Sequence, residues 1–175
     1  MIKNMRKKIF IYLLLLFACP VFAQNVSLKI LKKETTIDQM GFVKLVVEIK
    51  NKSKSEITIL KPAIKPDQKW RYYDIDIECN DMPIFMGVEV NLVEYSDDDL
   101  ITISPNSTIK LLVDGRYNAN MLSCNSKKFK VELFYDSNEL LKDIDEKGLS
   151  FTEKELIKKL TPMKMTSKKT KIIIQ

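Results

Sequence analysis

The chain has 175 residues, a formal net charge of +6 and no histidine. A chain without histidine cannot form a Ser-His-Asp or Cys-His hydrolase site, a common zinc enzyme site, or a histidine-ligated haem or copper site. Any enzyme built from it would have to work with carboxylates, lysine, tyrosine or serine alone.

The first 23 residues are organised like a secretory signal peptide. Four basic residues precede an apolar run over 9–18, which is too short to cross a bilayer as a stable helix, and residues 21–23 (Val-Phe-Ala) end in the small residue that signal peptidase needs. We therefore expect a signal peptide over 1–23 and a single domain over 24–175, with no transmembrane span in the mature chain. Removing the leader lowers the net charge from +6 to +2. The remaining lysines are scattered, so no nucleic-acid partner is expected.

The same leader permits a second interpretation. Residues 16–19 (Leu-Phe-Ala-Cys) resemble a lipoprotein signal, which would leave Cys19 acylated and the protein tethered to a membrane. Phe17 is bulky for that motif, and Pro20 directly after the cysteine is unfavourable. The expected location is therefore periplasmic or extracellular, with anchoring through Cys19 as the alternative.

Strand patterns begin directly after the leader. Val26, Leu28 and Ile30 alternate in the first of them. Residues 42–50 (FVKLVVEIK) then alternate with a period of two, which is typical of a half-buried strand. A polar turn over 51–56 and a further strand over 57–60 follow, and together they predict a hairpin.

The next strand carries an acidic face. In YYDIDIECND, Asp74, Asp76 and Glu78 alternate with Ile75, Ile77 and Cys79. Alternate side chains of a strand share one face, so this pattern predicts a solvated carboxylate row opposite a buried row. Calcium binding and paired-carboxylate glycosidase chemistry are the functional alternatives, but ligands at alternate positions lie about 7 Å apart.

Trp70 and Tyr72 precede this strand and would continue its acidic face. They could form an aromatic platform for a sugar or a peptide, which makes them the predicted binding face. Packing in the core is the competing interpretation for these rings.

Further strand signals complete an all-β pattern. They cover 88–92, 100–104, 109–113, 129–135 and 170–175, with a turn at Pro105-Asn106. Before the strand at 100–104, Asp97, Asp98 and Asp99 form a loop that is a second calcium candidate, but it lacks the ligand order and the glycine of an EF-hand. We expect an acidic turn there and no cofactor.

One segment breaks the period of two. Thr152-Glu153-Lys154-Glu155 has the spacing of a capping box, the apolar residues that follow it lie on one helical face, and Pro162 acts as a stop. A short helix is predicted over 153–160, inserted between the last two strands.

Two cysteines, Cys79 and Cys124, remain after the leader is removed. An even pair in an exported protein predicts a disulfide, because that compartment is oxidising. Closing a loop of about 45 residues would stabilise the fold by roughly 4 kcal/mol on the chain-entropy argument. Two separate buried thiols are the alternative.

Three segments carry a family resemblance. LVVEIKNKSKSEITIL is similar to the second and third strands of bacterial immunoglobulin-like modules, and ISPNSTIKLLV and KKFKVELFYD are similar to their later strands. Adhesion-type modules, fibronectin-like modules and the Bacillus-type proteinase-inhibitor domain share this pattern. The resemblance implies an antiparallel immunoglobulin-like sandwich of about seven or eight strands, and it transfers no catalytic residue.

These observations predict a non-enzymatic binding or structural module of the bacterial cell envelope. Its partner would be a protein or a glycan. A proteinase inhibitor with an immunoglobulin-like fold and a carbohydrate-binding module are the two alternatives.

Overall fold

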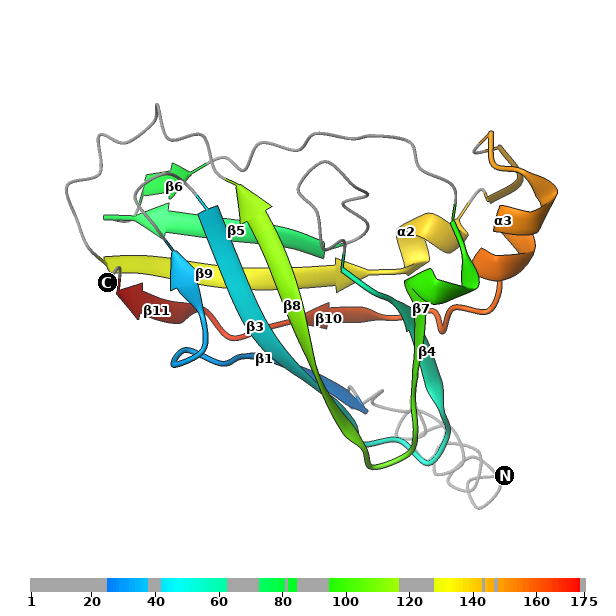
Figure 1. Ribbon diagram of the computed structural model, residues 1–175, viewed down its shortest axis with the longest axis horizontal. Coiled ribbons are helices and arrows are strands. Elements are labelled where there is room, and N and C mark those ends of the chain that lie inside the picture. Colours follow the sequence, from blue (N-terminus) through cyan, green and yellow to red (C-terminus); the bar gives the residue numbers. More distant parts are fainter. Residues whose placement is uncertain are drawn as a thin grey trace, which may run out of the picture.

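The computed structural model describes residues 25–37, 42–62, 73–80, 82–84, 95–116, 128–142, 144–146 and 148–173. These residues form two facing antiparallel sheets and a two-stranded ribbon (Figure 1). The strands are β1 (Val26–Ile30), β2 (Thr36–Ile37), β3 (Phe42–Asn51), β4 (Ile57–Leu60), β5 (Tyr73–Cys79), β6 (Met82–Ile84), β7 (Leu100–Ile103), β8 (Thr108–Arg116), β9 (Lys128–Asp136), β10 (Lys164–Thr166) and β11 (Thr170–Ile173). The helical segments are η1 (Asp97–Asp99), α2 (Asn138–Leu141), η3 (Ile144–Glu146) and α3 (Phe151–Ile157).

The first sheet is built around β3. Strand β8 pairs with β3 along almost its whole length, while β1 and β2 pair with successive parts of it. The alternation read from the sequence sets the two faces, because Val43, Leu45, Val47 and Ile49 are all fully buried. The intervening residues lie on the outer surface or are only partly covered.

The second sheet is built around β9. Strand β5 pairs with β9 from Tyr73 to Cys79, β6 pairs with β5, and β10 and β11 pair with successive parts of β9. Strand β1 lies against β10 and β2 against β11, so the two sheets meet along one side. In Figure 1, β3 and β8 run obliquely across β5 and β9.

The core fills the space between the two sheets. Tyr73, Phe129 and Tyr135 are its largest buried side chains in the second sheet, and Leu45 and Ile49 of β3 belong to the same cluster. The predicted all-β antiparallel sandwich is therefore confirmed. Eleven strands are present in the described ranges instead of seven or eight, partly because the strands next to β3 and β9 are each divided in two.

The division of the strand next to β9 has a local cause. Three residues, 167–169, lie opposite only two residues of β9, between the pairs Thr166–Phe134 and Thr170–Val131. The Ser167 N–H donates to the Leu133 carbonyl oxygen (2.9 Å), and the Leu133 N–H donates to Ser167 Oγ (2.9 Å). The buried Ser167 hydroxyl thus replaces a backbone acceptor, and the following residues bulge outward.

The predicted hairpin over 42–60 is wrong. Strand β3 pairs with β8, whereas β4 pairs with β7 in a separate ribbon. The side chain of Asn51, which is fully buried, explains the change of direction. Its amide nitrogen lies near the carbonyl oxygens of Ser55 (2.8 Å), Ile103 (3.0 Å) and Ser104 (3.2 Å), and its oxygen accepts hydrogen bonds from Ser53. Residues 51–56 are therefore a corner between two sheets.

The β4–β7 ribbon is tied to the rest of the domain through the second edge of β4. Thr58 exchanges hydrogen bonds with Thr161, and both backbone polar groups of Leu60 bind tyrosine hydroxyls of the second sheet. The predicted turn at Pro105-Asn106 joins β7 to β8 and is confirmed by the left-handed backbone of Asn106 (φ 58°). Strand β8 then continues past Asp114 to Arg116.

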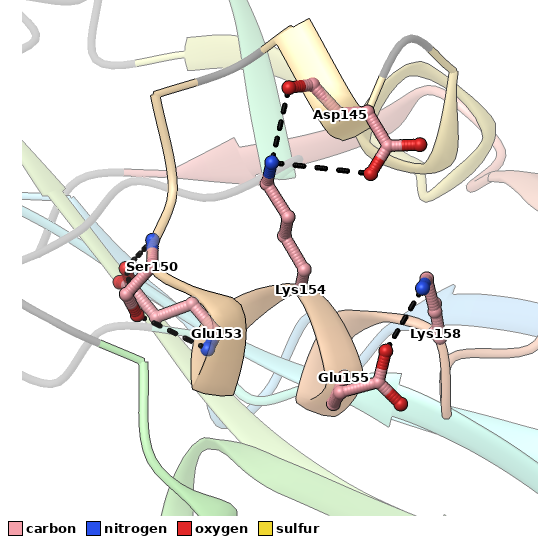
Figure 2. A network of polar contacts seen from close by, with 6 residues as sticks. All are labelled: Asp145, Ser150, Glu153, Lys154, Glu155 and Lys158. Atoms are coloured by element: carbon pink, nitrogen blue, oxygen red, sulfur yellow. Dashed lines mark hydrogen bonds and ion pairs between the residues drawn. The ribbon is translucent and has the colours of Figure 1, made fainter.

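The predicted helix exists, but both of its ends differ from the predicted range 153–160, because α3 spans Phe151–Ile157. Helix α3 begins at Phe151, and its N-cap is Ser150 instead of Thr152. Ser150 Oγ accepts from the Glu153 N–H (3.2 Å), and the Ser150 N–H donates to Glu153 Oε2 (3.0 Å), as Figure 2 shows. Both hydroxyl residues have a glutamate three positions later, so the spacing alone does not distinguish them. The reciprocal capping box forms between Ser150 and Glu153, whereas Glu155 pairs with Lys158 (2.8 Å).

Several other elements differ from the sequence prediction. Strands β2, β6 and β10 and the one-turn helix α2 were not predicted, and each has only two to four residues. The strand predicted over 88–92 lies outside the described residues. Among the helices that are described, none is long and apolar enough to cross a membrane.

Candidate functional site: the outer face of the second sheet

The carboxylate row predicted from YYDIDIECND is present on β5. Asp74 and Asp76 are exposed and Glu78 is partly exposed, while Tyr73, Ile75, Ile77 and Cys79 are buried. The pleat of the strand separates the two sets, as expected from the period of two. The row therefore lies on the outer face of the second sheet.

A lysine of the chain itself occupies one end of this row. The bulge between β10 and β11 carries Lys169, whose Nζ lies 2.6 Å from Glu78 Oε1. The hydrogen bond with Glu78 raises the pKa of Lys169, and the nearby charges of Glu132 and Asp76 act in the same direction. The Lys169 ammonium group thus offsets part of the negative charge at this end of the row.

The second calcium candidate is a short helical turn, η1. Asp97 Oδ1 pairs with Lys159 Nζ (2.9 Å), while Asp99 Oδ2 accepts hydrogen bonds from the N–H (2.8 Å) and the hydroxyl (3.1 Å) of Ser96. Asp98 is exposed. In the part of the chain that the structure describes, no three Asp, Glu or Cys side chains lie close enough to hold a metal ion together. The two candidate sets are separate surface features.

A depression of about 370 Å³ lies near the other end of the row. It is lined by Asp74, Phe134, Asp136, Glu139 and Lys164. Asp74 lies directly opposite Phe134 in the β5–β9 register, and Lys164 of β10 lies opposite Asp136. Glu139 comes from α2, which begins two residues after β9 ends. Three strands and a helical turn therefore meet around the depression.

Asp136 is a structural member of this lining. Lys164 Nζ lies 3.2 Å from its Oδ2, and the backbone N–H and side-chain amide of Asn138 donate to its Oδ1 (2.9 and 3.1 Å). Burial alone would raise the pKa of Asp136, but the hydrogen bonds from Lys164 and Asn138 outweigh it and lower the pKa below its usual value. The carboxylate stays ionised at neutral pH and anchors the start of α2.

Asp74 differs from Asp136 in its polar contacts. Its carboxylate is exposed, and it forms no hydrogen bond or ion pair in the described ranges. The ring of Phe134 beside it lies on the outer face and is only partly buried. The depression thus presents an available carboxylate next to an aromatic surface.

The remaining predicted site residues are only partly described. Trp70 and Tyr72 lie outside the described residues, as does Cys124. Cys79 is at the end of β5 and is 1% exposed. A Cys79–Cys124 disulfide therefore stays a prediction.

Four lining residues were not predicted as part of a site, namely Phe134, Asp136, Glu139 and Lys164. The strand predicted over 129–135 includes Phe134, and Asp136 directly follows it. What the sequence did not contain was the register that places Phe134 opposite Asp74. Because that register joins segments about 60 residues apart, no local pattern specifies it.

Comparison of the chain with protein-family models and with curated proteins finds no match in either.

Proposed function

We propose that this chain is a non-enzymatic, exported binding module of the bacterial cell envelope, with an immunoglobulin-like sandwich. The signal-peptide pattern of residues 1–23 supports export. The strand order supports the fold type: β1/β2, β3 and β8 face β10/β11, β9, β5 and β6, which parallels the A-B-E and G-F-C-C′ strands of immunoglobulin-like domains.

The chemistry of the outer face supports a non-enzymatic role. The chain has no histidine. Asp136 is held ionised by Lys164 and Asn138, so it is unsuited to donate a proton at neutral pH. Glu78 is paired with Lys169 on an open sheet surface. Acid–base catalysis by two carboxylates needs one of them to stay protonated, and the contacts of Asp136 favour its ionised form.

The observation that carries the proposal is the depression beside Asp74 and Phe134. Its lining carries three carboxylates and one ammonium group, so its net charge is negative. A lysine or arginine side chain of a partner could place its charge beside Asp74 and its alkyl stem against the Phe134 ring, where cation–π attraction adds to the ion pair. The partner class that fits is a polypeptide presenting a basic side chain.

A titration followed by NMR tests this proposal. Nα-acetyl-arginine amide is expected to perturb the resonances of Phe134, its β5 neighbours and α2, and Nα-acetyl-glutamine amide is expected not to. Asp74→Asn should weaken binding several-fold. Asp98→Asn, which removes an exposed carboxylate of η1 outside this lining, should leave binding unchanged.

Two other outcomes would change the conclusion. If soluble cell-wall oligosaccharides perturb the same resonances and the arginine compound does not, the chain is a carbohydrate-binding module at this face. If neither compound class perturbs them, the depression is not the binding site and the proposal fails.

A further inference from the structure

Strand β8 pairs with β3 along one of its two edges. The Asn51 N–H donates to the Ser107 carbonyl oxygen (2.9 Å), which shows that the odd-numbered residues of this strand direct their backbone groups toward β3. The backbone groups of Lys110, Leu112 and Asp114 therefore point the other way. Across the described ranges, no strand pairs with that edge and no hydrogen bond from these backbone groups is present.

The side chains along this edge place opposite charges at equal distances on either side of Leu112. Leu112 is 40% exposed on the outer face of the first sheet. Lys110 lies two residues before it and Asp114 two residues after it, so the same face carries a positive, an apolar and a negative position in turn. An antiparallel copy of the same strand would present them in reverse order.

Asp114 lacks the partner that this arrangement would supply. The residue is only partly buried, but its Oδ1 atom is closed to solvent and accepts no hydrogen bond from the residues that the structure describes. Burial raises the pKa of Asp114, and the charge of Lys44 opposes this only in part. An additional cation beside this carboxylate would be favourable.

We propose that β8 is a self-association edge, which pairs antiparallel with β8 of a second copy about a two-fold axis at Leu112. In this register Lys110 lies opposite Asp114 of the second copy, and the reverse pair forms by symmetry. Leu112 packs against its own equivalent. The outward backbone groups of all three residues enter the new ladder.

The neighbouring strand extends the charge complementarity. In the β3–β8 register Lys44 lies opposite Asp114, and Glu48 lies opposite Lys110. A continuous sheet through the dimer would therefore carry a row of alternating sign: Lys44, Asp114, then Lys110 and Glu48 of the second copy. At the junction, Asp114 would lie between Lys44 and Lys110 of the second copy. Lys110, whose Nζ already pairs with Glu34 Oε1 (2.8 Å), would lie between Glu48 and Asp114 of the second copy.

The same charges disfavour other registers. A shift of one copy by two residues in one direction brings Lys110 against Leu112, and a shift in the other direction brings Lys110 against Arg116. Lysine on an edge strand normally prevents pairing with foreign strands, because it meets no counter-charge. The symmetric arrangement of β8 removes this obstacle for a second copy in one register alone.

The expected complex is weak. A single pair of edge strands covers less surface than a standard interface of about 1,600 Å², so dissociation in the range of roughly 10 µM to 1 mM is expected. The association should therefore depend on concentration and should weaken with salt. Sedimentation equilibrium over that concentration range measures it directly.

A complementary pair of variants gives the decisive test. In a dimer of the Lys110→Glu variant, two carboxylates would face each other at both symmetric positions, and in a dimer of the Asp114→Lys variant two ammonium groups would do so. Each variant alone should therefore dimerise roughly tenfold or more weakly than the unaltered chain. When the two variants are mixed in equal amounts, a carboxylate of the first faces an ammonium group of the second at both symmetric positions. The mixture should recover association.

Thermal melting of each variant confirms that it folds. Lys168→Glu changes an exposed lysine of the opposite sheet and should dimerise like the unaltered chain. Three outcomes would each overturn the inference: an unaltered chain that is monomeric at 1 mM, single variants that associate as it does, or a folded mixture that stays monomeric.

Discussion

The ring centroids of Tyr73 and Tyr135 lie 4.8 Å apart in the core, and the two hydroxyl groups bind the two backbone polar groups of a single residue, Leu60. Tyr73 donates to the Leu60 carbonyl oxygen (2.8 Å), and Tyr135 accepts from the Leu60 N–H (3.2 Å). Leu60 is the last residue of β4. The chain leaves the first sheet at the Asn51 corner, before β4 begins. The two hydroxyls thus hold the β4–β7 ribbon against the second sheet.

Removing one of these hydroxyls is expected to destabilise the fold. Tyr73→Phe leaves the buried Leu60 carbonyl without its donor and should lower the free energy of unfolding by about 1–3 kcal/mol, measured by urea denaturation. Phe151→Ala changes a side chain that is 79% exposed and should stay within about 0.5 kcal/mol of the unaltered protein. If the two variants unfold at the same urea concentration, Tyr73 does not support the ribbon.

The same tyrosine predicts a loss of stability at alkaline pH. Burial, together with the neighbouring Tyr135, raises the pKa of Tyr73 well above its usual value of 10.0. The unfolded chain therefore releases this proton first, so the stability contribution is complete below pH 10 and is lost as the pH rises through the raised pKa. Urea denaturation between pH 8 and pH 11 should show this decline. It should be shallower for Tyr73→Phe, and equal slopes would contradict the assignment.

The Asn51 corner is expected to be sensitive to substitution. Asn51→Ala removes the donors to the Ser55, Ile103 and Ser104 carbonyl oxygens, of which the bond to Ile103 is buried. The expected loss is about 2 kcal/mol or more, because a buried carbonyl is left unpaired. Lys52→Ala, at the exposed next position, is the matched control and should be nearly neutral. An Asn51→Ala variant as stable as this control would show that the corner forms without its amide.

The sequence predicted burial better than it predicted pairing. The period of two in 42–50 and 73–79 correctly separated buried from outer residues, because alternation is a property of one strand. Which strands pair is decided by interactions between distant residues, and Asn51 illustrates the difference. It was interpreted as the start of a hairpin turn, yet its amide contacts Ile103, 52 residues away, and directs β4 to another partner.

The same reasoning applies to the depression. The acidic row of β5 could be predicted from one segment of sequence. Phe134 and Lys164 could not be assigned to it, because their placement depends on the β5–β9 and β9–β10 registers. The register of β11 depends in the same way on the bulge at Ser167. A bulge moves every later residue by one position, and its signal is a single buried hydroxyl.

The corrected start of α3 gives a direct comparison between two hydroxyl residues. Ser150→Ala should lower the free energy of unfolding by about 1 kcal/mol because it removes the acceptor for the Glu153 N–H. Thr152→Ala lies within the first turn and should be neutral or slightly stabilising, since alanine has the higher helix propensity. Thermal melting of the two variants distinguishes them, and the reverse order would restore Thr152 as the N-cap.

The predicted Cys79–Cys124 disulfide can be tested by alkylation under denaturing conditions. Cys79 is 1% exposed, so a reagent reaches it only when the chain unfolds. If the bond exists, the exported protein denatured with iodoacetamide should gain no adduct without reductant and two adducts after reduction, as read from its intact mass. Reduction should also destabilise the fold by about 2–4 kcal/mol. Two adducts without reductant would show separate thiols, and the same spectrum shows whether the chain begins at Gln24 or at an acylated Cys19.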